Sequence, residues 1–490
     1  MSLKKYCILL ALLTFLAFIP SLKNGLVWDD KEIIFEQIKH IEGLNIYKPN
    51  FIYYRPITHI SFLFDYFLWK YNPFGYHLTN VTLHILNVLL FFILLNKIFA
   101  RLKLDLTFIL LLSLVFAFHP VHVESISWIA GRTDILVTFF SLLTLIAAQL
   151  YLERQDKKIL ILIFVFFLLA LASKEMAIVL LPILFIENFI TKKDKTFNIC
   201  LLLIISVIIF CILTKISGLR TYGWHFNLIS LIKATGFYLK SLIFPYPFHS
   251  YMPYLPVWGI YITLFFFILA GLIFFSIFKK NKLYAQVGLA YLNMFLISLL
   301  PVLALIVFHI GATPVAWRYL YLPSLFFILS IGIWTINIKN VKLATLGLSL
   351  CFFLITITHQ SIWRDDFHFW KRAVTLAGKD YAIPHHQYAL ALWEKGDLKT
   401  AEKHFLLALN AKDIQAYPWE KAVVYNNLGR LYATQKKWRN AEKCFKKALF
   451  YNPNYKPALC SLGKLYLFLY QKNNDKTFLK KAKKFLKKCH

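Results

Sequence analysis

Long apolar runs alternate with short polar connections through the first 360 residues. A helix that crosses a membrane needs about 20 apolar residues. By that measure the pattern predicts about eleven membrane-spanning helices, in an all-α, polytopic membrane helix bundle formed by residues 1–360. The predicted spans lie near residues 6–22, 78–99, 105–121, 134–152, 157–173, 175–191, 197–215, 257–278, 283–308, 319–338 and 343–359.

Clusters of lysine and arginine mark every second connection between these runs. They are Lys4/Lys5, Lys97/Arg101/Lys103, Arg154/Lys157/Lys158, Lys192/Lys193/Lys195, Lys279/Lys280/Lys282 and Lys339/Lys342. Basic residues concentrate in cytoplasmic loops. We therefore expect a cytoplasmic N-terminus on an uncleaved first span, and an extracytoplasmic chain after about residue 360. The expected outer loops are 23–77 and 216–256, with shorter ones at 119–133 and 309–318.

The segment 228–244 decides between eleven and twelve spans. Lys233 and Lys240 are seven residues apart and therefore share one helical face. This spacing favours a helix that lies in the outer membrane interface. A twelfth span here would instead place the C-terminal region in the cytoplasm. We predict the interfacial helix and eleven crossings.

Beyond residue 360 the pattern changes to short, polar, repetitive helices. The sequence NLGRLY at Asn427–Tyr432 recurs as SLGKLY at Ser461–Tyr466, a period of 34 residues. An earlier copy runs from Tyr388 to Leu409. This period is typical of tetratricopeptide repeats (TPRs), which are stacked helix pairs. Residues 361–490 are therefore predicted to form an extracytoplasmic TPR α-solenoid of about three repeats.

The amino-acid composition supports the assignment to the membrane and limits which kinds of partner are expected. The chain is 59% hydrophobic and holds 47 phenylalanines, which excludes an ordinary soluble globule. Its net charge of +31 could indicate nucleic-acid binding, but the basic residues flank apolar runs or lie in the last hundred residues, so no nucleic-acid partner is expected. The seven cysteines form no CxxC pair and no cluster with histidine, which predicts neither a metal site nor a disulfide framework.

Unusual polar residues gather in the predicted outer loops. Asp29 and Asp30 directly follow the first apolar run, in a chain with only 24 acidic residues. An acidic pair at such a place could also start a solvated loop or cap a helix. Placing ionisable side chains at membrane depth costs free energy, so residues of this kind are usually retained for a function. The whole set therefore indicates a functional site. Its other members are Arg55, His59, His77, His119, His122, Glu124, Arg132, Asp134, Lys174, Glu175 and Arg318.

Six stretches of the sequence carry specific motifs. They are VWDD (27–30), YYRPITHISFLFDYFLWKYNPFGYHLTNVTLHILN (53–87), HPVHVESISWIAGRTDIL (119–136), SKE (173–175), RYLYLPS (318–324) and WRDDFHFWKRA (363–373). With the repeats that follow, they resemble the TMTC (transmembrane and tetratricopeptide-containing) proteins and their bacterial relatives. That family belongs to the GT-C class of glycosyltransferases, with the protein O-mannosyltransferases. The resemblance covers nearly the whole chain.

The resemblance implies a GT-C enzyme that uses a polyprenyl-phosphate sugar, often mannose. Such an enzyme glycosylates Ser or Thr hydroxyls of proteins on the outer face of the cytoplasmic membrane. The resemblance does not imply a divalent metal or another cofactor. It does imply that the TPR region contacts the protein acceptor. In that class the first outer loop carries an acidic pair, one member of which is the proposed base. That pair corresponds to Asp29 and Asp30.

The residues themselves fit this chemistry. A carboxylate must take the proton of the acceptor hydroxyl, and cations must stabilise the phosphate leaving group. One base and no covalent intermediate predict inversion at the anomeric carbon. Asp29 and Asp30 supply the base, with Asp30 slightly favoured, and the other residues of the set are expected to bind the donor phosphate and sugar.

The sequence is also compatible with other functions. The same chemistry could act on lipid A or on a surface glycan. A transporter should show polar groups at mid-membrane and internal symmetry between its halves, and the sequence shows neither. A non-catalytic membrane scaffold that presents TPRs would not need Asp29, Asp30, Arg55 and Arg132 together.

Overall fold

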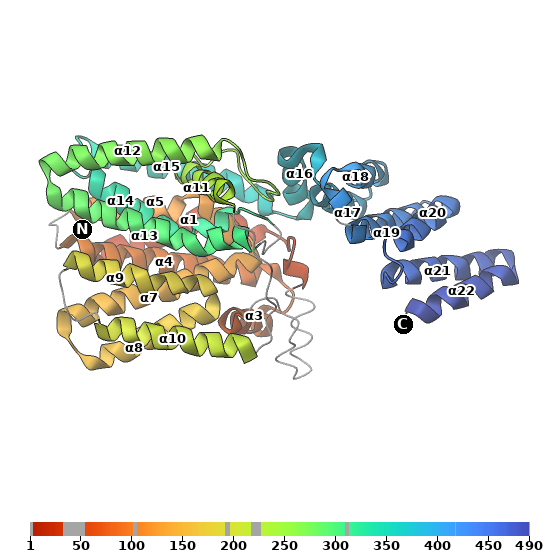
Figure 1. The fold of residues 1–490 in the computed structure, drawn as a ribbon, viewed down its shortest axis with the longest axis horizontal. Helices are drawn as coiled ribbons and strands as arrows, with labels where there is room; N and C mark the ends of the chain where they lie inside the picture. Colours follow the sequence, from red (N-terminus) through yellow and green to blue (C-terminus); the bar gives the residue numbers. More distant parts are fainter. Residues whose placement is uncertain are drawn as a thin grey trace. The chain divides into compact units, whose positions relative to one another are not determined.

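The computed structural model describes residues 3–32, 54–100, 105–191, 197–216, 227–308, 313–416 and 418–489. Within these ranges every regular element is a helix (Figure 1), which confirms the all-α fold. The predicted outer loops are described only in part, because residues 33–53, 217–226 and 309–312 lie outside these ranges. So do residues 101–104, which hold part of one basic cluster, and residues 192–196, which hold all of another.

The chain divides into two compact units. The membrane unit comprises Met1–His249 and Tyr254–Asp365, and the TPR unit comprises Ser250–Pro253 and Asp366–His490. The boundary thus falls five residues beyond the expected one at 360/361, and four residues of a loop between membrane helices belong to the TPR unit.

Each of the eleven predicted spans overlaps one helix of the membrane unit. They are α1 (Leu3–Phe18), α4 (Pro73–Ala100), α5 (Leu106–Phe118), α7 (Arg132–Arg154), α8 (Lys157–Ser173), α9 (Leu180–Thr191), α10 (Phe197–Ile216), α12 (Gly259–Lys280), α13 (Lys282–Val307), α14 (Pro323–Thr335) and α15 (Val341–His359). In the described part of the chain, six helices are long and apolar enough to cross a membrane, or seven if the bent α5 and its continuation to Ser127 form one span. The chain is therefore a multi-pass membrane protein.

The membrane helices differ in how much of their surface is buried. All residues of α5 from Phe108 to Phe118 are buried, so this helix lies inside the bundle. On α12 only the stripe Gly259, Thr263, Phe266 and Ala270 is buried, at helical spacing. The other faces of α12 expose large apolar side chains, as expected of a helix that borders lipid.

Two shorter helices run at a steep angle to the long ones, α3 (Pro56–Trp69) and α11 (Leu228–Ile243) (Figure 1). The exposed face of α3 is apolar and includes Ile60, Phe64 and Phe67, which suits a helix in the membrane interface. Helix α11 occupies the segment predicted to be interfacial. It crosses α12 backbone to backbone, since a Cβ added to Gly236 would lie 1.8 Å from the carbonyl oxygen of Gly259.

The TPR unit is a series of antiparallel helix pairs. Its helices are α16 (Asp366–Ala377), α17 (Ala382–Glu394), α18 (Leu398–Asn410), α19 (Pro418–Thr434), α20 (Trp438–Tyr451), α21 (Lys456–Asn473) and α22 (Lys476–Cys489). The pairs α17/α18, α19/α20 and α21/α22 correspond to the three predicted repeats. Small residues such as Ala401, Ala441 and Ala448 are fully buried, so the helices approach closely.

A disulfide joins Cys460 in α21 to Cys489 in α22, with a Cα–Cα distance of 5.2 Å. The cysteine spacing offered no disulfide framework to read, and this single pair was not predicted. These two residues are 29 positions apart and become neighbours only because the helices pair antiparallel, which the cysteine spacing alone does not reveal. The remaining five cysteines are free.

Candidate functional site

The loop that follows α1 holds its two aspartates in different environments. Asp30 is fully buried, and its carboxylate accepts the backbone N–H groups of Val27 at 3.0 Å and Ala130 at 2.9 Å. It therefore ties this loop to the segment before α7. Asp29 is only partly buried. The preceding Trp28 has a φ of 55°, which is rare for a bulky residue and often found at functional sites.

The environment of Asp29 changes its acidity. Burial raises the pKa of this carboxyl from 3.8 to about 6, against the opposing charge of Arg318 and with a smaller contribution from Glu32. A carboxylate of this pKa is ionised at neutral pH and still accepts a proton readily. These are the properties of a general base.

Aromatic rings surround the guanidinium of Arg318, which lies in the short helix η7 (Trp317–Leu320). Its Cζ atom lies 4.7 Å from the ring centroid of Tyr319, 5.2 Å from that of Trp128 and 5.9 Å from that of Trp28. Trp28 and Trp128 are stacked, with centroids 5.2 Å apart. The residue next to Asp29 is thus part of the wall around Arg318.

Glu124 fixes the position of Arg318. One carboxylate oxygen of Glu124 accepts a 2.5 Å bond from the guanidinium, and the other accepts the backbone N–H groups of Trp317 and Arg318. A second guanidinium nitrogen contacts the Tyr319 hydroxyl at 3.2 Å. An arginine side chain has five N–H donors, so these contacts leave it the capacity to bind an anion.

Two other predicted cations, Lys174 and Arg55, also form ion pairs. Lys174 Nζ lies 2.6 Å from Asp134 Oδ1, and both side chains are almost fully buried. Arg55 binds Glu175 through two nitrogens, at 2.5 and 3.0 Å. His59 is half-buried, and its pKa is lowered by burial and then by the charge of Arg55. Each predicted cation here is thus matched by a predicted carboxylate.

Lys174 and Arg318 lie around one aromatic ring. The Nζ atom of Lys174 is 5.0 Å from the ring centroid of Tyr319, whose ring also contacts Arg318. The structure therefore brings together one group of predicted residues from four distant parts of the sequence: Asp29, Glu124, Arg318 and the Lys174–Asp134 pair.

Arg132 has a different setting. It is fully buried, and its guanidinium donates to Asn80 Oδ1 at 2.7 Å, to the carbonyl of Tyr76 at 2.9 Å and to that of Ser61 at 3.1 Å. It also forms an ion pair with the buried Asp65. Its donors are thereby used to hold α3, α4 and α7 together. Sequence reasoning missed Asp65 and Asn80, although each is a polar residue within an apolar run, which was the available signal.

Three of the predicted histidines, His77, His119 and His122, are buried. His119 Nε2 is 2.9 Å from the carbonyl of Leu242, and His77 Nε2 is 3.4 Å from that of Gly25. His122 Nε2 is 2.9 Å from the Ser324 hydroxyl. These bonds cross between distant segments, so they position the loops around the site.

The buried His84, next to these residues, was not among the predicted site residues. His84 lies inside α4, with Nδ1 2.5 Å from the Tyr321 hydroxyl and Nε2 3.0 Å from the carbonyl of Ala117. Its ring contacts that of His122 at 5.8 Å. Within the described residues no group of three or more His, Cys, Asp or Glu side chains is arranged to hold a metal ion.

The fold defines a multi-pass membrane protein that carries tetratricopeptide repeats. Residues 380–449 match the model of a tetratricopeptide repeat family. Over 386 residues the chain is 24% identical to protein O-mannosyl-transferase F38B6.6 of Caenorhabditis elegans, which covers 73% of this chain and 53% of the worm protein. It is 24% identical over 258 residues to protein O-mannosyl-transferase Tmtc1 of Drosophila melanogaster, covering 48% of this chain and 28% of the fly protein.

A shorter region is more similar to a mammalian protein. The chain is 37% identical over 101 residues to protein O-mannosyl-transferase TMTC1 of Mus musculus, covering 21% of this chain and 10% of the mouse protein. The chain thus spans about half the length of the worm relative and less of the other two. These similarities, together with the repeat match, support membership of this chain in the TMTC family.

Proposed function

We propose that this chain is an inverting membrane glycosyltransferase. In this proposal it moves a sugar, mannose-like, from a polyprenyl-phosphate donor to Ser or Thr hydroxyls of proteins on the outer face of the cytoplasmic membrane. The observation that carries the proposal is the placement of Asp29, with a pKa of about 6, beside Arg318. The relatives named as protein O-mannosyl-transferases give the class of reaction.

The proposed step uses Asp29 as the base. It takes the proton of the acceptor hydroxyl while the hydroxyl oxygen forms a bond to the anomeric carbon. The bond from that carbon to the phosphate oxygen breaks, and the electron pair leaves with the polyprenyl phosphate. Arg318 stabilises the charge that develops on this phosphate. A single displacement inverts the anomeric centre.

The neighbouring residues serve as positioning groups in this proposal. Asp30 holds the loop through the N–H groups of Val27 and Ala130, so it is not the base. Glu124 keeps Arg318 in place through three contacts. Lys174, paired with Asp134, packs on the same tyrosine ring and helps to hold that ring beside Arg318.

The proposal extends to partners and to location. The N-terminus is cytoplasmic and the TPR unit extracytoplasmic, where it contacts the protein acceptor. The disulfide between Cys460 and Cys489 supports that location, because disulfides persist in oxidising compartments. The reaction needs no divalent metal, so a chelator leaves its rate unchanged.

The test uses the full chain in lipid nanodiscs, with radiolabelled polyprenyl-phosphate mannose and a Ser/Thr-rich acceptor peptide. Asp29→Asn should lower the transfer rate about 100-fold or more, as for loss of a general base. Glu32→Gln, a change at an exposed neighbouring carboxylate, is the matched control and should retain activity. If a folded Asp29→Asn protein retained full activity, the base would lie elsewhere. Transfer to a lipid or glycan acceptor instead of the peptide would contradict the acceptor class.

A further inference from the structure

Helix α22 separates its lysines from its apolar residues. In a helix of 3.6 residues per turn, six of the lysines fall within an arc of about 140°, with only Thr477 between them. A seventh, Lys481, lies 5.5 and 5.6 Å from the ring centroids of Tyr466 and Phe478. We call the six together the lysine face: Lys476, Lys480, Lys483, Lys484, Lys487 and Lys488.

The opposite face of α22 is covered by α21. Ala482 is only 1% exposed, and a Cβ added to Gly463 of α21 would lie 2.8 Å from the side chain of Leu486. The ring of Phe485 contacts that of Tyr466, with centroids 5.9 Å apart. These contacts fix the rotation of α22 about its axis, and all six side chains of the lysine face are exposed.

Among the described residues, no carboxylate forms an ion pair with the lysine face. Helices α16 to α20 each contain one acidic residue, whereas α21 and α22 contain none. The ion pairs of Glu402 and Glu442 are with lysines outside α22. Asp475, directly before α22, accepts the backbone N–H of Thr477 at 2.8 Å and so caps the helix. The positive potential of the lysine face is therefore not offset by neighbouring carboxylates of the TPR unit.

The need for a polar end of the repeat stack does not explain this arrangement. The outer face of a terminal repeat must be polar for solubility, and charges of both signs would provide that. Four pairs of lysines in the face are instead spaced i,i+4, where like charges destabilise a helix. An external anionic surface would offset this repulsion.

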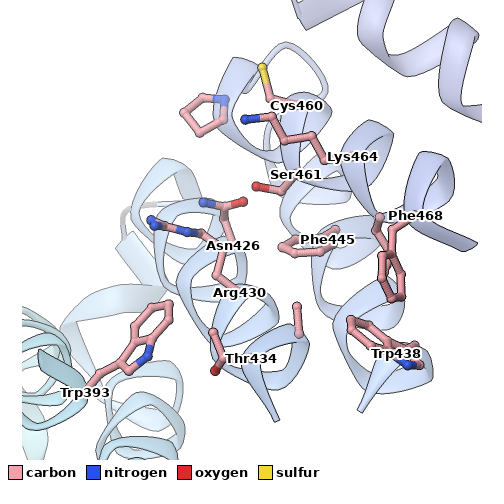
Figure 2. A pocket seen from close by; sticks show the side chains of 13 residues that line it. Trp393, Asn426, Arg430, Thr434, Trp438, Phe445, Cys460, Ser461, Lys464 and Phe468 are labelled. Atoms are coloured by element: carbon pink, nitrogen blue, oxygen red, sulfur yellow. The ribbon is translucent and has the colours of Figure 1, made fainter. Parts of the chain in front are cut away.

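The chemistry of the lysine face favours lipid headgroups over a compact ligand. Lysine ammonium groups are point charges on flexible stems, without the planar fork through which arginine binds one carboxylate or phosphate. Figure 2 shows Cys460 and Lys464 of α21 at a cavity of about 560 Å³, and no residue of α22 lines that cavity. A row of exposed lysines outside a pocket suits the diffuse negative potential of anionic headgroups. Because the chain is a multi-pass membrane protein, a lipid surface is always available to it.

We propose that the lysine face of α22 binds the headgroups of anionic phospholipids at a membrane surface. The disulfide between Cys460 and Cys489 holds the end of α22 on α21, so the six ammonium groups are presented by a fixed helix and not by a free tail. The proposal does not depend on sugar transfer, since lipid binding is measured without a donor or an acceptor.

The test measures co-sedimentation of the full chain, held in neutral phosphatidylcholine nanodiscs, with sucrose-loaded vesicles. One set of vesicles is pure phosphatidylcholine, and the other contains about 30% phosphatidylglycerol, which gives it a negative surface potential. The chain should bind the anionic vesicles about tenfold or more strongly than the neutral ones. This binding should weaken as salt rises from about 50 to about 300 mM, because exposed charges are screened.

A pair of double variants distinguishes the lysine face from the other basic surfaces of the chain. Lys480→Glu with Lys487→Glu should weaken binding to anionic vesicles about tenfold or more, since each lysine near such a surface contributes about fivefold. Each new glutamate lies four residues from a remaining lysine, which favours the helix. The matched control is Arg439→Glu with Lys443→Glu, the same charge change at exposed positions of α20, and it should retain binding.

Equal binding to the two kinds of vesicle, unchanged binding by the α22 variant, or equal loss in the two double variants would each overturn the proposal. So would binding of fluorescein-labelled poly-glutamate by a chain that does not sediment with anionic vesicles, since the lysine face would then recognise an acidic polypeptide. Circular dichroism and thermal unfolding show whether each variant is folded.

Discussion

Adjacent, chemically identical residues can have different roles when their partners differ, and Asp29 and Asp30 show this. The carboxylate of Asp30 accepts hydrogen bonds from two backbone N–H groups, one of them 100 residues away in sequence. Asp29 lies beside a cation and has an unusually high pKa. From the sequence we predict the pair, with Asp30 slightly favoured as the base, but not the bond that distinguishes its two members, because no residue near position 30 indicates a partner at Ala130. The same limit applies to Arg132, whose partner Asp65 becomes its neighbour only in the folded chain.

The raised pKa of Asp29 predicts the pH dependence of the reaction. A base must be ionised, so kcat/KM should fall as the pH decreases through about 6 and reach a plateau above it. The pH profile of transfer by the full chain measures this. An unshifted aspartate would instead lose activity only near pH 4.

Stability should respond with the opposite sign. Because the folded-state pKa of Asp29 is raised, the fold favours the protonated form, and the contribution is fully present below about pH 4. It is lost as the pH rises through about 6. Asp29→Asn should therefore raise the unfolding temperature at pH 8 and leave it unchanged at pH 3. A lower unfolding temperature at pH 8 would indicate that the ionised carboxylate stabilises the fold.

At the scale of elements, apolar runs located the membrane helices because a lipid-exposed helix must satisfy its backbone internally and present apolar side chains over its length. The 34-residue period located the TPR helices for a similar reason, since each repeat buries the same positions. Contacts between helices were not predictable in this way. The crossing of α11 and α12 depends on Gly236 and Gly259, two unremarkable residues in the sequence, which let the backbones touch.

This crossing gives a prediction on packing. A Cβ at Gly236 would meet the carbonyl oxygen of Gly259 at 1.8 Å, so Gly236→Ala must push the helices apart. Overpacking of this kind costs about 1–3 kcal/mol of stability. Thermal unfolding in detergent should show a lower midpoint for this variant.

Gly271→Ala is the matched control, because a Cβ at Gly271 in α12 meets nothing within 4 Å. Alanine is also the better helix former, by about 1 kcal/mol. The control should therefore be neutral or stabilising. Equal destabilisation by both variants would mean that the close crossing does not exist.

At the scale of the whole molecule, the disulfide tests the compartment of the TPR unit. Seven cysteines less the two in the disulfide leave five that react with a maleimide mass tag, and reduction should add two more tags. Closing a loop of 29 residues is worth about 3.6 kcal/mol in the chain-entropy model, so Cys460→Ser should also lower the unfolding midpoint of the TPR unit.

The same labelling can contradict the proposed orientation. Seven tags without reduction, on protein extracted under thiol-blocking conditions, would show that this unit resides in a reducing compartment. Replacement of Cys444, which is free, is the control and should remove one tag without affecting the disulfide.

The residues Ser250–Pro253 affect where this protein can be truncated. Because they belong to the TPR unit while their neighbours on both sides belong to the membrane unit, the chain passes between the units at 249/250, 253/254 and 365/366. Tyr251 and Met252 are only 2% and 4% exposed, and Tyr251 packs on Trp370. Truncation at residue 365 would therefore strip the cover from apolar side chains that stay behind. A truncated protein that aggregates or loses activity would report on this exposed loop as much as on the missing repeats.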